Sequence, residues 1–181
     1  MPYKVYRVKD VDETVLNDSV LEHCNYYSDL NMRKISKFAY AKMLELVKET
    51  FDKDLRDEEI IFEGKPHFKE SNIKFNISHE DNLVAVIVSE RECGIDLTRK
   101  VTKLELANKI LSFDEKQEFD KADDKEESIA QKWAMKEAYS KMTCTGLNEA
   151  LFSRTINVPI KEVTDETIDK KYYLCYMVES K

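Results

Sequence analysis

The sequence predicts a mixed α/β protein, because segments with the two-residue period of strands are interspersed with segments that carry the stripes of amphipathic helices. Between residues 73 and 77, Ile73, Phe75 and Ile77 alternate with polar residues, which indicates a half-buried strand. The run from residue 83 to 88 is apolar throughout and is typical of a strand buried on both faces. Residues 29–51 place apolar side chains along one helical stripe, which predicts an amphipathic helix.

The elements of the first half can be placed by their caps and turns. The long helix is expected to begin near Ser28 or Asp29, both good N-cap residues, and to end near Phe51. Asp81 and Asn82 form a turn dipeptide between two strands, and a charged hairpin tip follows the second strand. Further strands are expected at residues 3–8, 60–62 and 93–97.

The second half is expected to contain more helix and to end in strands. Apolar residues recur at helical spacing between residues 104 and 111. The following Ser112 and Glu115 match a capping box, so a second helix should run from there to about Lys121. Another helix is expected from Ser128 to about Met142, with Asp124 and Glu127 at its start. The strands are expected around residues 157–160 and 172–178.

Composition restricts the class of protein. The chain has 181 residues, of which 42% are hydrophobic and 36% charged, with a net charge of -7. This acidity argues against a protein that binds nucleic acid or an anionic membrane, since such binding depends on basic patches. The four cysteines form no CxxC pair, and neither a transmembrane run nor a signal-peptide core is found. A cytoplasmic protein with reduced thiols is expected.

Two acidic residues stand out for their settings. Strand geometry places Asp96 on the same face as Gly94 and Thr98, so a rigid carboxylate lies beside a glycine that lets a backbone or ligand approach. On the helix near residue 133, Glu137 and Lys141 share one stripe above two alanines. The alternatives are a strand whose polar face happens to carry Asp96, and an ordinary surface pair between Glu137 and Lys141.

Other candidates also have ordinary structural explanations. Glu115 fits a helix cap as well as a catalytic carboxylate. Arg33 and Lys37 lie four residues apart in the densest basic cluster of the chain, which is also the pattern of a solvated helix face. The turn around Lys65 and Pro66 can be a plain surface turn.

Several motifs in a fixed order resemble the 4'-phosphopantetheinyl transferase superfamily, in its larger, single-chain branch similar to the surfactin synthetase activator. The order and spacing carry the resemblance, because each short motif alone is common. It covers residues 60–147 best. The motifs are Gly64-Lys65-Pro66, Phe75-Asn76-Ile77-Ser78-His79, Gly94-Ile95-Asp96-Leu97, Trp133-Ala134-Met135-Lys136-Glu137-Ala138 with Lys141, and Gly146-Leu147.

The resemblance implies an α+β fold of two similar subdomains related by a pseudo-twofold axis. Each subdomain is expected to pack a small, mostly antiparallel sheet on helices, with the active site in the cleft between them. The boundary would fall at the hairpin tip, giving an N-terminal subdomain of residues 1–90 on the nucleotide side of coenzyme A. Residues 91–181 would form a C-terminal subdomain that carries the metal and catalytic residues.

The resemblance also implies an activity: transfer of the phosphopantetheinyl arm of coenzyme A to a serine of an apo carrier protein, with release of 3',5'-ADP. The cation would be Mg²⁺, or Mn²⁺ in its place, since hard cations bridge phosphates and prefer oxygen ligands. Asp96 and Glu137 match the metal ligands of the family, and Glu115 aligns with a further catalytic glutamate. Water or Glu115 would complete the metal shell, and Glu137 or Glu115 would take the proton of the serine. Lys141 matches a basic residue that assists the leaving group.

The coenzyme A side is assigned in the same way. His79 matches a histidine that binds the 3'-phosphate, and Ser78 precedes it in the same motif. Lys65 and Pro66 match the loop on the adenine side. Further phosphate contacts are expected from basic residues, namely Lys136, Arg33 and Lys37.

Two positions depart from the usual pattern of the family. Thr98 stands where many members of this branch carry a second acid, so the site has one carboxylate fewer. Glu80 follows His79 where Ser or Thr is usual. Two other functions stay open: a non-catalytic module that binds coenzyme A or a carrier protein, and a metal-dependent phosphohydrolase that cleaves coenzyme A. The expected partners are an acyl or peptidyl carrier protein of undetermined pathway and coenzyme A, and the enzyme is expected to be a monomer.

Overall fold

The structure is a computed structural model that describes residues 3–101 and 103–180. The Cα positions divide the chain into two compact units. One comprises the residues up to Cys93 together with the last four from Val178, and the other spans Gly94–Met177.

The first unit is built on a three-stranded antiparallel sheet of β1 (Tyr3–Arg7), β4 (Lys74–Glu80) and β5 (Leu83–Ser89). β5 lies in the middle of the order β1-β5-β4. This central place explains its apolar sequence, because residues 83–88 are all buried and a strand with neighbours on both edges and cover on its faces has no polar side. The turn at Asp81, with φ +50°, joins β4 to β5 as predicted.

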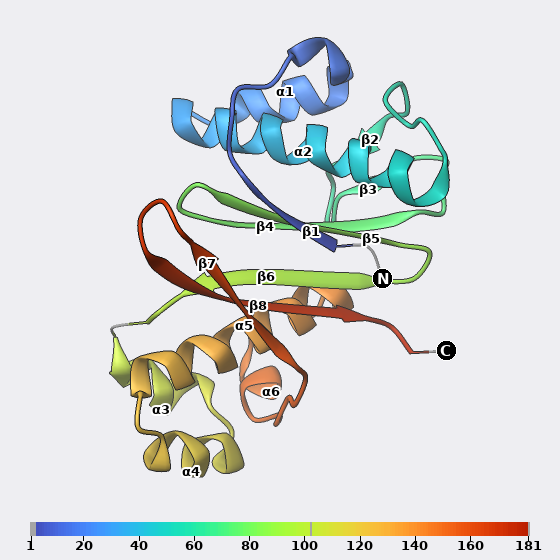
Figure 1. Cartoon of the computed structure of the whole chain (residues 1–181). Coiled ribbons are helices and arrows are strands. Elements are labelled where there is room, and N and C mark those ends of the chain that lie inside the picture. The colour runs from blue at the N-terminus through green and yellow to red at the C-terminus, as the bar shows by residue number, and fades with distance from the viewer. Residues whose placement is uncertain (1–2, 102, 181) are drawn as a thin grey trace. The chain divides into compact units, whose positions relative to one another are not determined.

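The long helix α2 (Leu30–Phe51) covers this sheet, as Figure 1 shows. It begins where the sequence predicts, because the Asp29 side chain accepts hydrogen bonds from two backbone N–H groups of the first turn. The shorter α1 (Asp18–Tyr26) packs on α2 and follows a 3₁₀ turn, η1 (Glu13–Val15). α1 was not predicted.

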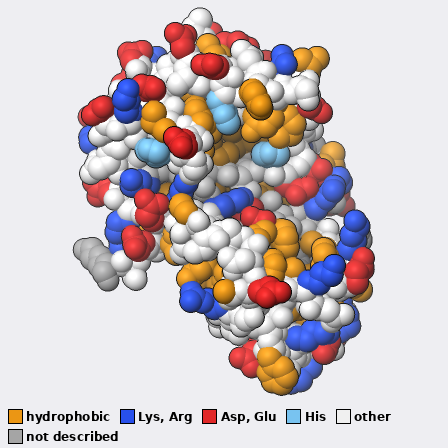
Figure 2. Space-filling model, turned by 180° about the vertical axis from the view of Figure 1, so that it is seen from behind, with side chains coloured by type: hydrophobic (Ala, Val, Ile, Leu, Met, Phe, Trp, Pro, Cys, Tyr) orange, Lys and Arg blue, Asp and Glu red, His pale blue; other side chains and the backbone are white. Residues whose placement is uncertain are grey.

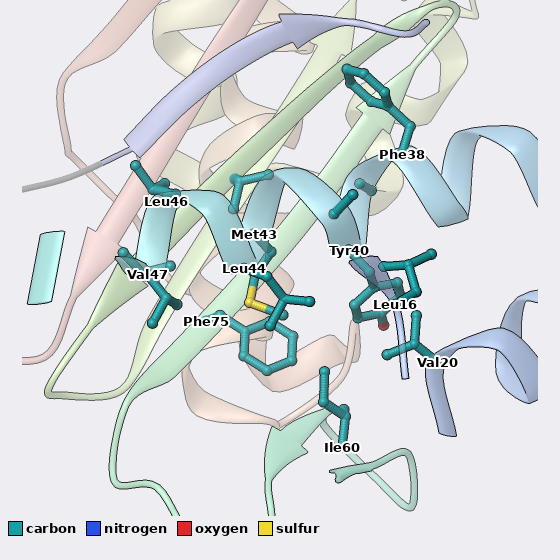
Figure 3. Close-up of a cluster of buried hydrophobic side chains, with 14 of the residues drawn as sticks. Leu16, Val20, Phe38, Tyr40, Met43, Leu44, Leu46, Val47, Ile60 and Phe75 are labelled. Atoms are coloured by element: carbon teal, nitrogen blue, oxygen red, sulfur yellow. The ribbon is translucent and has the colours of Figure 1, made fainter. Parts of the chain in front are cut away.

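The core of this unit lies between the helices and the sheet (Figure 3). Met43, Leu44 and Val47 of α2 meet Phe75 of β4 and Ile60, and all five side chains are buried. Fully burying side chains of this size contributes about 1.5–3 kcal/mol each, so the helical stripe fixes α2 on the sheet. Ile60 belongs to a two-stranded sheet of β2 (Ile60–Ile61) and β3 (His67–Phe68).

The second unit combines a three-stranded sheet with a group of helices (Figure 1). Its strands follow the order β6-β8-β7, with β7 and β8 antiparallel. They are β6 (Cys93–Arg99), β7 (Ile160–Asp165) and β8 (Lys170–Val178). The helical elements are η2 (Leu104–Leu106), α3 (Ala107–Ile110), α4 (Phe113–Lys121), α5 (Lys125–Thr143) and α6 (Glu149–Phe152).

The predicted mixed fold with small antiparallel sheets is therefore confirmed, whereas the pseudo-twofold relation and the cleft stay predictions. Helix α5 begins at Lys125, three residues earlier than predicted, because the Asp124 side chain caps it by accepting from the Glu127 backbone N–H.

Acidic and basic side chains are interspersed over the face in Figure 2. Among residues 3–101 and 103–180, no helix is both long and apolar enough to cross a bilayer.

Candidate active site

Strand β6 holds Asp96 rigidly and almost out of contact with solvent. Ile95 and Leu97 on either side of it are buried in the core, and Asp96 itself is only 5% exposed. Because neighbouring side chains of a strand point to opposite faces, Asp96 shares its face with Gly94 and Thr98. A carboxylate this buried must find partners within the protein.

Gly94 allows helix α5 to lie directly on that face of β6. A Cβ atom added at Gly94 would stand 2.0 Å from the carbonyl oxygen of Ala138 and 2.6 Å from the backbone nitrogen of Met142. No side chain fits in that space. The expected close approach at this glycine is thus made by the backbone of α5, the helix that carries Glu137 and Lys141.

Within its own unit, Asp96 accepts hydrogen bonds from the side chains of Lys141 and Thr98. Lys141 Nζ donates to Asp96 Oδ1 at 2.7 Å and also to the carbonyl oxygen of Ile95 at 3.3 Å. Thr98 Oγ1 donates to Asp96 Oδ2 at 2.6 Å. The helix and the strand are therefore joined by a largely buried, charge-assisted hydrogen bond. Lys141 thus pairs with Asp96, 45 residues away in sequence.

Glu137 is half-buried on α5 in the electrostatic field of this pair. Burial raises the pKa of Glu137 above its ordinary value, the Lys141 ammonium opposes that shift, and the Asp96 carboxylate adds to it. A half-buried carboxyl group whose pKa is raised, close to a second carboxylate and an ammonium, is the kind of cluster found at functional sites.

These residues fit a magnesium ion. Mg²⁺ binds to proteins through one or two carboxylates and keeps water and substrate phosphates as its other ligands, and Asp96 and Glu137 supply two carboxylates that lie in one another's electrostatic field. In the described part of the chain, no group of three or more His, Cys, Asp or Glu side chains is arranged to hold a metal by itself. Thr98, at the place of a further acid, instead fixes the orientation of Asp96.

Glu115 and Lys136 form a separate pair. Both side chains are fully buried, and Lys136 Nζ lies 2.8 Å from Glu115 Oε2. Glu115 also accepts from the backbone N–H groups of Ser112 and Ile156, and it completes the predicted capping box of α4. Lys136 donates further hydrogen bonds to carbonyl oxygens at the end of α6, of which that of Arg154 is nearest at 2.7 Å. This network ties α4, α5 and α6 together.

The residues predicted for coenzyme A belong to the first unit, apart from Lys136. On β4, Ser78 is buried and the next residue, His79, is exposed, because consecutive side chains of a strand face opposite ways. Lys65 and Pro66 lie in the turn between β2 and β3, and Lys65 Nζ pairs with Glu92 at 2.8 Å. All of these assignments stay predictions.

The basic cluster at the start of α2 is largely neutralised by acids. Lys37 Nζ pairs with Glu13 at 2.7 Å, and Lys34 pairs with an aspartate at 2.8 Å. The Arg33 guanidinium donates to the carbonyl oxygen of Tyr27. The structure therefore gives Arg33 and Lys37 local structural partners in the first unit.

A cavity of about 400 Å³ lies beside α2 in the first unit, among Phe38, Lys42, Glu45 and neighbouring residues. None of the described candidate residues lines it. The candidate site is defined by side-chain contacts and charge rather than by this cavity.

Two participants were missed by sequence reasoning. Thr98 was treated as the loss of an acid, although a hydroxyl on the same strand face as Asp96 is also a hydrogen-bond donor to it. Glu92 was assigned only to the hairpin tip, and no local pattern signals its contact with Lys65, 27 residues away. Contacts at such separation depend on the tertiary fold.

Comparison with known proteins agrees with the geometry. Residues 92–176, which include Asp96, Glu137 and Lys141, match the sequence profile of the 4'-phosphopantetheinyl transferase superfamily. The resemblance that the motifs predicted is thereby confirmed for this part of the chain.

Among individual proteins, the chain is similar to the 4'-phosphopantetheinyl transferase psf-1 of Bacillus pumilus. The two are 35% identical over 106 residues, which is 54% of this chain and 46% of that protein. The matched part thus spans about half the length of the relative.

Proposed function

We propose that the protein transfers the 4'-phosphopantetheinyl arm of coenzyme A to a serine of an apo carrier protein and releases 3',5'-ADP. The observation that carries this proposal is the cluster of Asp96, Glu137 and Lys141, in which a strand and a helix bring two carboxylates and an ammonium together. The matches of this region to the superfamily and to the Bacillus pumilus transferase support the choice of reaction.

Asp96 and Glu137 would hold the magnesium ion. The ion, when bound, supplies positive charge that offsets the negative charge of the pyrophosphate. Thr98 keeps the Asp96 carboxylate in one orientation through its hydrogen bond, which is the contribution that a neighbouring donor makes to a metal ligand.

Glu137 is also the base that we propose for the serine hydroxyl. A carboxylate whose pKa is raised by burial accepts a proton more readily near neutral pH than an ordinary one. In the transfer, the serine oxygen bonds to the phosphorus that bears the pantetheine. The bond from that phosphorus to the bridging oxygen breaks, and the electron pair leaves with 3',5'-ADP. The serine proton goes to Glu137.

Lys141 supports the departing 3',5'-ADP in this proposal. Its side chain is 28% exposed, whereas that of Asp96 is 7% exposed. The ammonium is therefore the more accessible partner, and its long side chain can donate to a phosphate oxygen while staying near the carboxylate. Neutralising charge that develops on a leaving phosphate is the main catalytic need of phosphoryl transfer.

For Glu115 and Lys136 we propose a supporting role. Their charges are balanced and their hydrogen-bonding groups are satisfied by one another and by the backbone. The pair fixes the second half of α5 against α4 and α6, and Glu137 follows Lys136 directly. The catalytic and metal-binding roles first expected for Glu115 pass in this proposal to Glu137.

The nucleotide of coenzyme A is proposed to bind to residues of the first unit, among them His79, Lys65 and Pro66. The resemblance is the ground for this assignment. The carrier protein, a cytoplasmic location and a monomeric state belong to the same proposal.

One experiment tests the reaction. The protein is incubated with coenzyme A, Mg²⁺ and an apo carrier protein, and the carrier is weighed by mass spectrometry while nucleotide products are separated. We expect the carrier to gain the mass of one phosphopantetheinyl arm with release of 3',5'-ADP. Binding of coenzyme A without a mass gain would identify a binding module, and cleavage of coenzyme A without a carrier would identify a phosphohydrolase.

Two variants assign the site within that assay. Glu137→Gln keeps the shape of the side chain but removes the base, so kcat should fall by roughly 10²–10⁴-fold. Asp96→Asn should also abolish most transfer, and Asp123→Asn, at an exposed position of the same unit, is the matched control that should leave transfer unchanged. Equal activity of Asp96→Asn and Asp123→Asn would reject the site.

A further inference from the structure

Glu92 contacts three other segments of the first unit, namely the turn at Lys65, strand β4 at Lys74 and the C-terminal segment at Glu179. Its Oε2 atom accepts from Lys65 Nζ at 2.8 Å, and its Oε1 atom lies 3.6 Å from Lys74 Nζ. Its own carbonyl oxygen accepts from the backbone N–H of Glu179 at 2.9 Å. Lys65 Nζ donates in addition to the carbonyl oxygen of Cys93 at 2.8 Å. Lys65 therefore makes two hydrogen bonds to consecutive residues at the start of β6.

The Lys65–Glu92 contact is not an ordinary surface ion pair. The Lys65 side chain is only 16% exposed, and a shielded ammonium depends on its partners more than a solvated one does. Burial would raise the pKa of Glu92, but the hydrogen bond and charge of Lys65, together with Lys74, hold that pKa below its ordinary value. Lys65 and Lys74 thus favour the charged form of Glu92.

The turn that carries Lys65 has few other restraints. It joins β2 and β3, which pair over only two residues each. Gly64 has φ +75° with no atom within 4 Å of its Cβ position, and Pro66 has no N–H group to donate. The His67 Nδ1 atom lies 3.0 Å from the carbonyl oxygen of Lys65, which is a contact within the turn. The side chain of Lys65 therefore gives this turn a long-range tether.

We propose that Glu92 is a positioning residue, which fixes the Gly64-Lys65-Pro66 turn through the partly buried ammonium of Lys65. The ammonium of Lys65 is already paired with Glu92 and with the Cys93 carbonyl oxygen. We therefore expect the turn to contribute to coenzyme A binding through its fixed position rather than through an unpaired positive charge. The part of this inference that concerns coenzyme A rests on the proposed function. The tether itself does not, because it depends only on contacts within the first unit.

The first test measures the tether in the free protein. Hydrogen–deuterium exchange of the backbone amides in residues 63–68 is compared among the wild type, Glu92→Ala, Glu92→Gln and Glu63→Gln. Glu63 is an exposed acid of the same turn and is the matched control for the loss of one charge. Glu92→Ala should speed exchange about tenfold, which corresponds to the loss of one charge-assisted hydrogen bond. Glu92→Gln should have a smaller effect, and Glu63→Gln should exchange like the wild type.

The second test measures the consequence for coenzyme A. In the carrier-mass assay, Glu92→Ala should raise KM for coenzyme A about tenfold and leave kcat within about twofold. A merely destabilised protein would instead lose active molecules, which lowers kcat at constant KM. The doubly exchanged Lys65→Glu, Glu92→Lys protein should recover part of the exchange protection that either single variant loses.

The outcomes separate the two proposals. Unchanged exchange in Glu92→Ala, or no recovery in the double variant, would overturn the tether. Faster exchange with an unchanged KM would overturn the positioning role. If the wild type neither binds coenzyme A nor modifies a carrier, the proposed function fails, and the exchange results still decide whether Glu92 holds the turn.

Discussion

Replacing Gly94 with alanine tests the packing on which the candidate site depends. The added methyl group would lie 2.0 Å from the Ala138 carbonyl oxygen and 2.6 Å from the Met142 nitrogen, where ordinary contact begins at 3.4 Å. Both obstacles are backbone atoms of α5, so no side-chain rotation relieves the overlap. The helix must move away from β6 by more than about 1 Å, since packed interiors have no spare volume.

Such a shift has two measurable effects. Overpacking of this kind costs about 1–3 kcal/mol, which urea unfolding followed by circular dichroism can detect. The shift also draws Lys141 and Glu137 away from Asp96, and a misplacement of about 1 Å lowers catalytic rates by roughly 10²-fold. We therefore expect Gly94→Ala to lose both stability and transfer activity under conditions where it is still folded.

Gly146→Ala is the control for this substitution. Gly146 has φ +69° and no atom within 4 Å of its Cβ position, so alanine there is strained by its backbone alone, at about 1–2 kcal/mol. It should lose comparable stability but keep its activity when folded. A Gly94→Ala protein with the stability of the wild type would refute the close packing of α5 on β6, and one that is destabilised but fully active would refute its role in the site.

Three further predictions concern neighbouring groups. Lys136→Met leaves the Glu115 carboxylate buried without its cation, so the free energy of unfolding in urea should fall by about 3–5 kcal/mol; unchanged stability with lost activity would point to direct catalysis instead. Thr98→Val removes the donor to Asp96 Oδ2 and should cost about 1–2 kcal/mol, whereas Thr98→Ser should not. The pKa of Glu137 is raised above its ordinary 4.5 in the folded state. Between pH 4.5 and that raised pKa, the folded protein therefore binds a proton that the unfolded chain does not, and the free energy of unfolding falls as pH rises through this range. Glu137→Gln should therefore be more stable than the wild type at pH 7 without metal, with no gain below pH 4.5; equal stability of the two at pH 7 would contradict the shift.

The parts of the fold that the sequence predicted are those with strong local signals. α2 was placed because Asp29 is a cap that precedes a long apolar stripe, and α4 because a capping box lies within four residues. β5 was placed because burial on both faces leaves an unbroken apolar run. Each of these signals lies within the element itself.

The parts that were missed have weak local signals or depend on contacts elsewhere. α1 buries only Val20 and Cys24, a stripe too narrow to stand out among polar residues.

For the site, the sequence could indicate residues but not their pairing. Asp96 and Lys141 were both candidates, yet their contact depends on α5 lying on Gly94. For Glu115 the role itself was ambiguous in the sequence, because a capping box and a catalytic carboxylate both call for a glutamate at this position. Only the position of Lys136 beside Glu115, both fully buried, favours the structural explanation.

The ion pair at Asp96 explains how an acidic site can be part of the core of its unit. A carboxylate that is 5% exposed would be costly without a counterion, and a second acid, Glu137, makes the cost greater. Lys141 supplies that counterion from the helix, and Thr98 satisfies the remaining oxygen where another carboxylate would have added repulsion. In the proposed reaction Asp96 would hold the magnesium ion together with Glu137. Lys141, which balances the charge of Asp96 in this structure, would donate to a phosphate oxygen of the departing 3',5'-ADP.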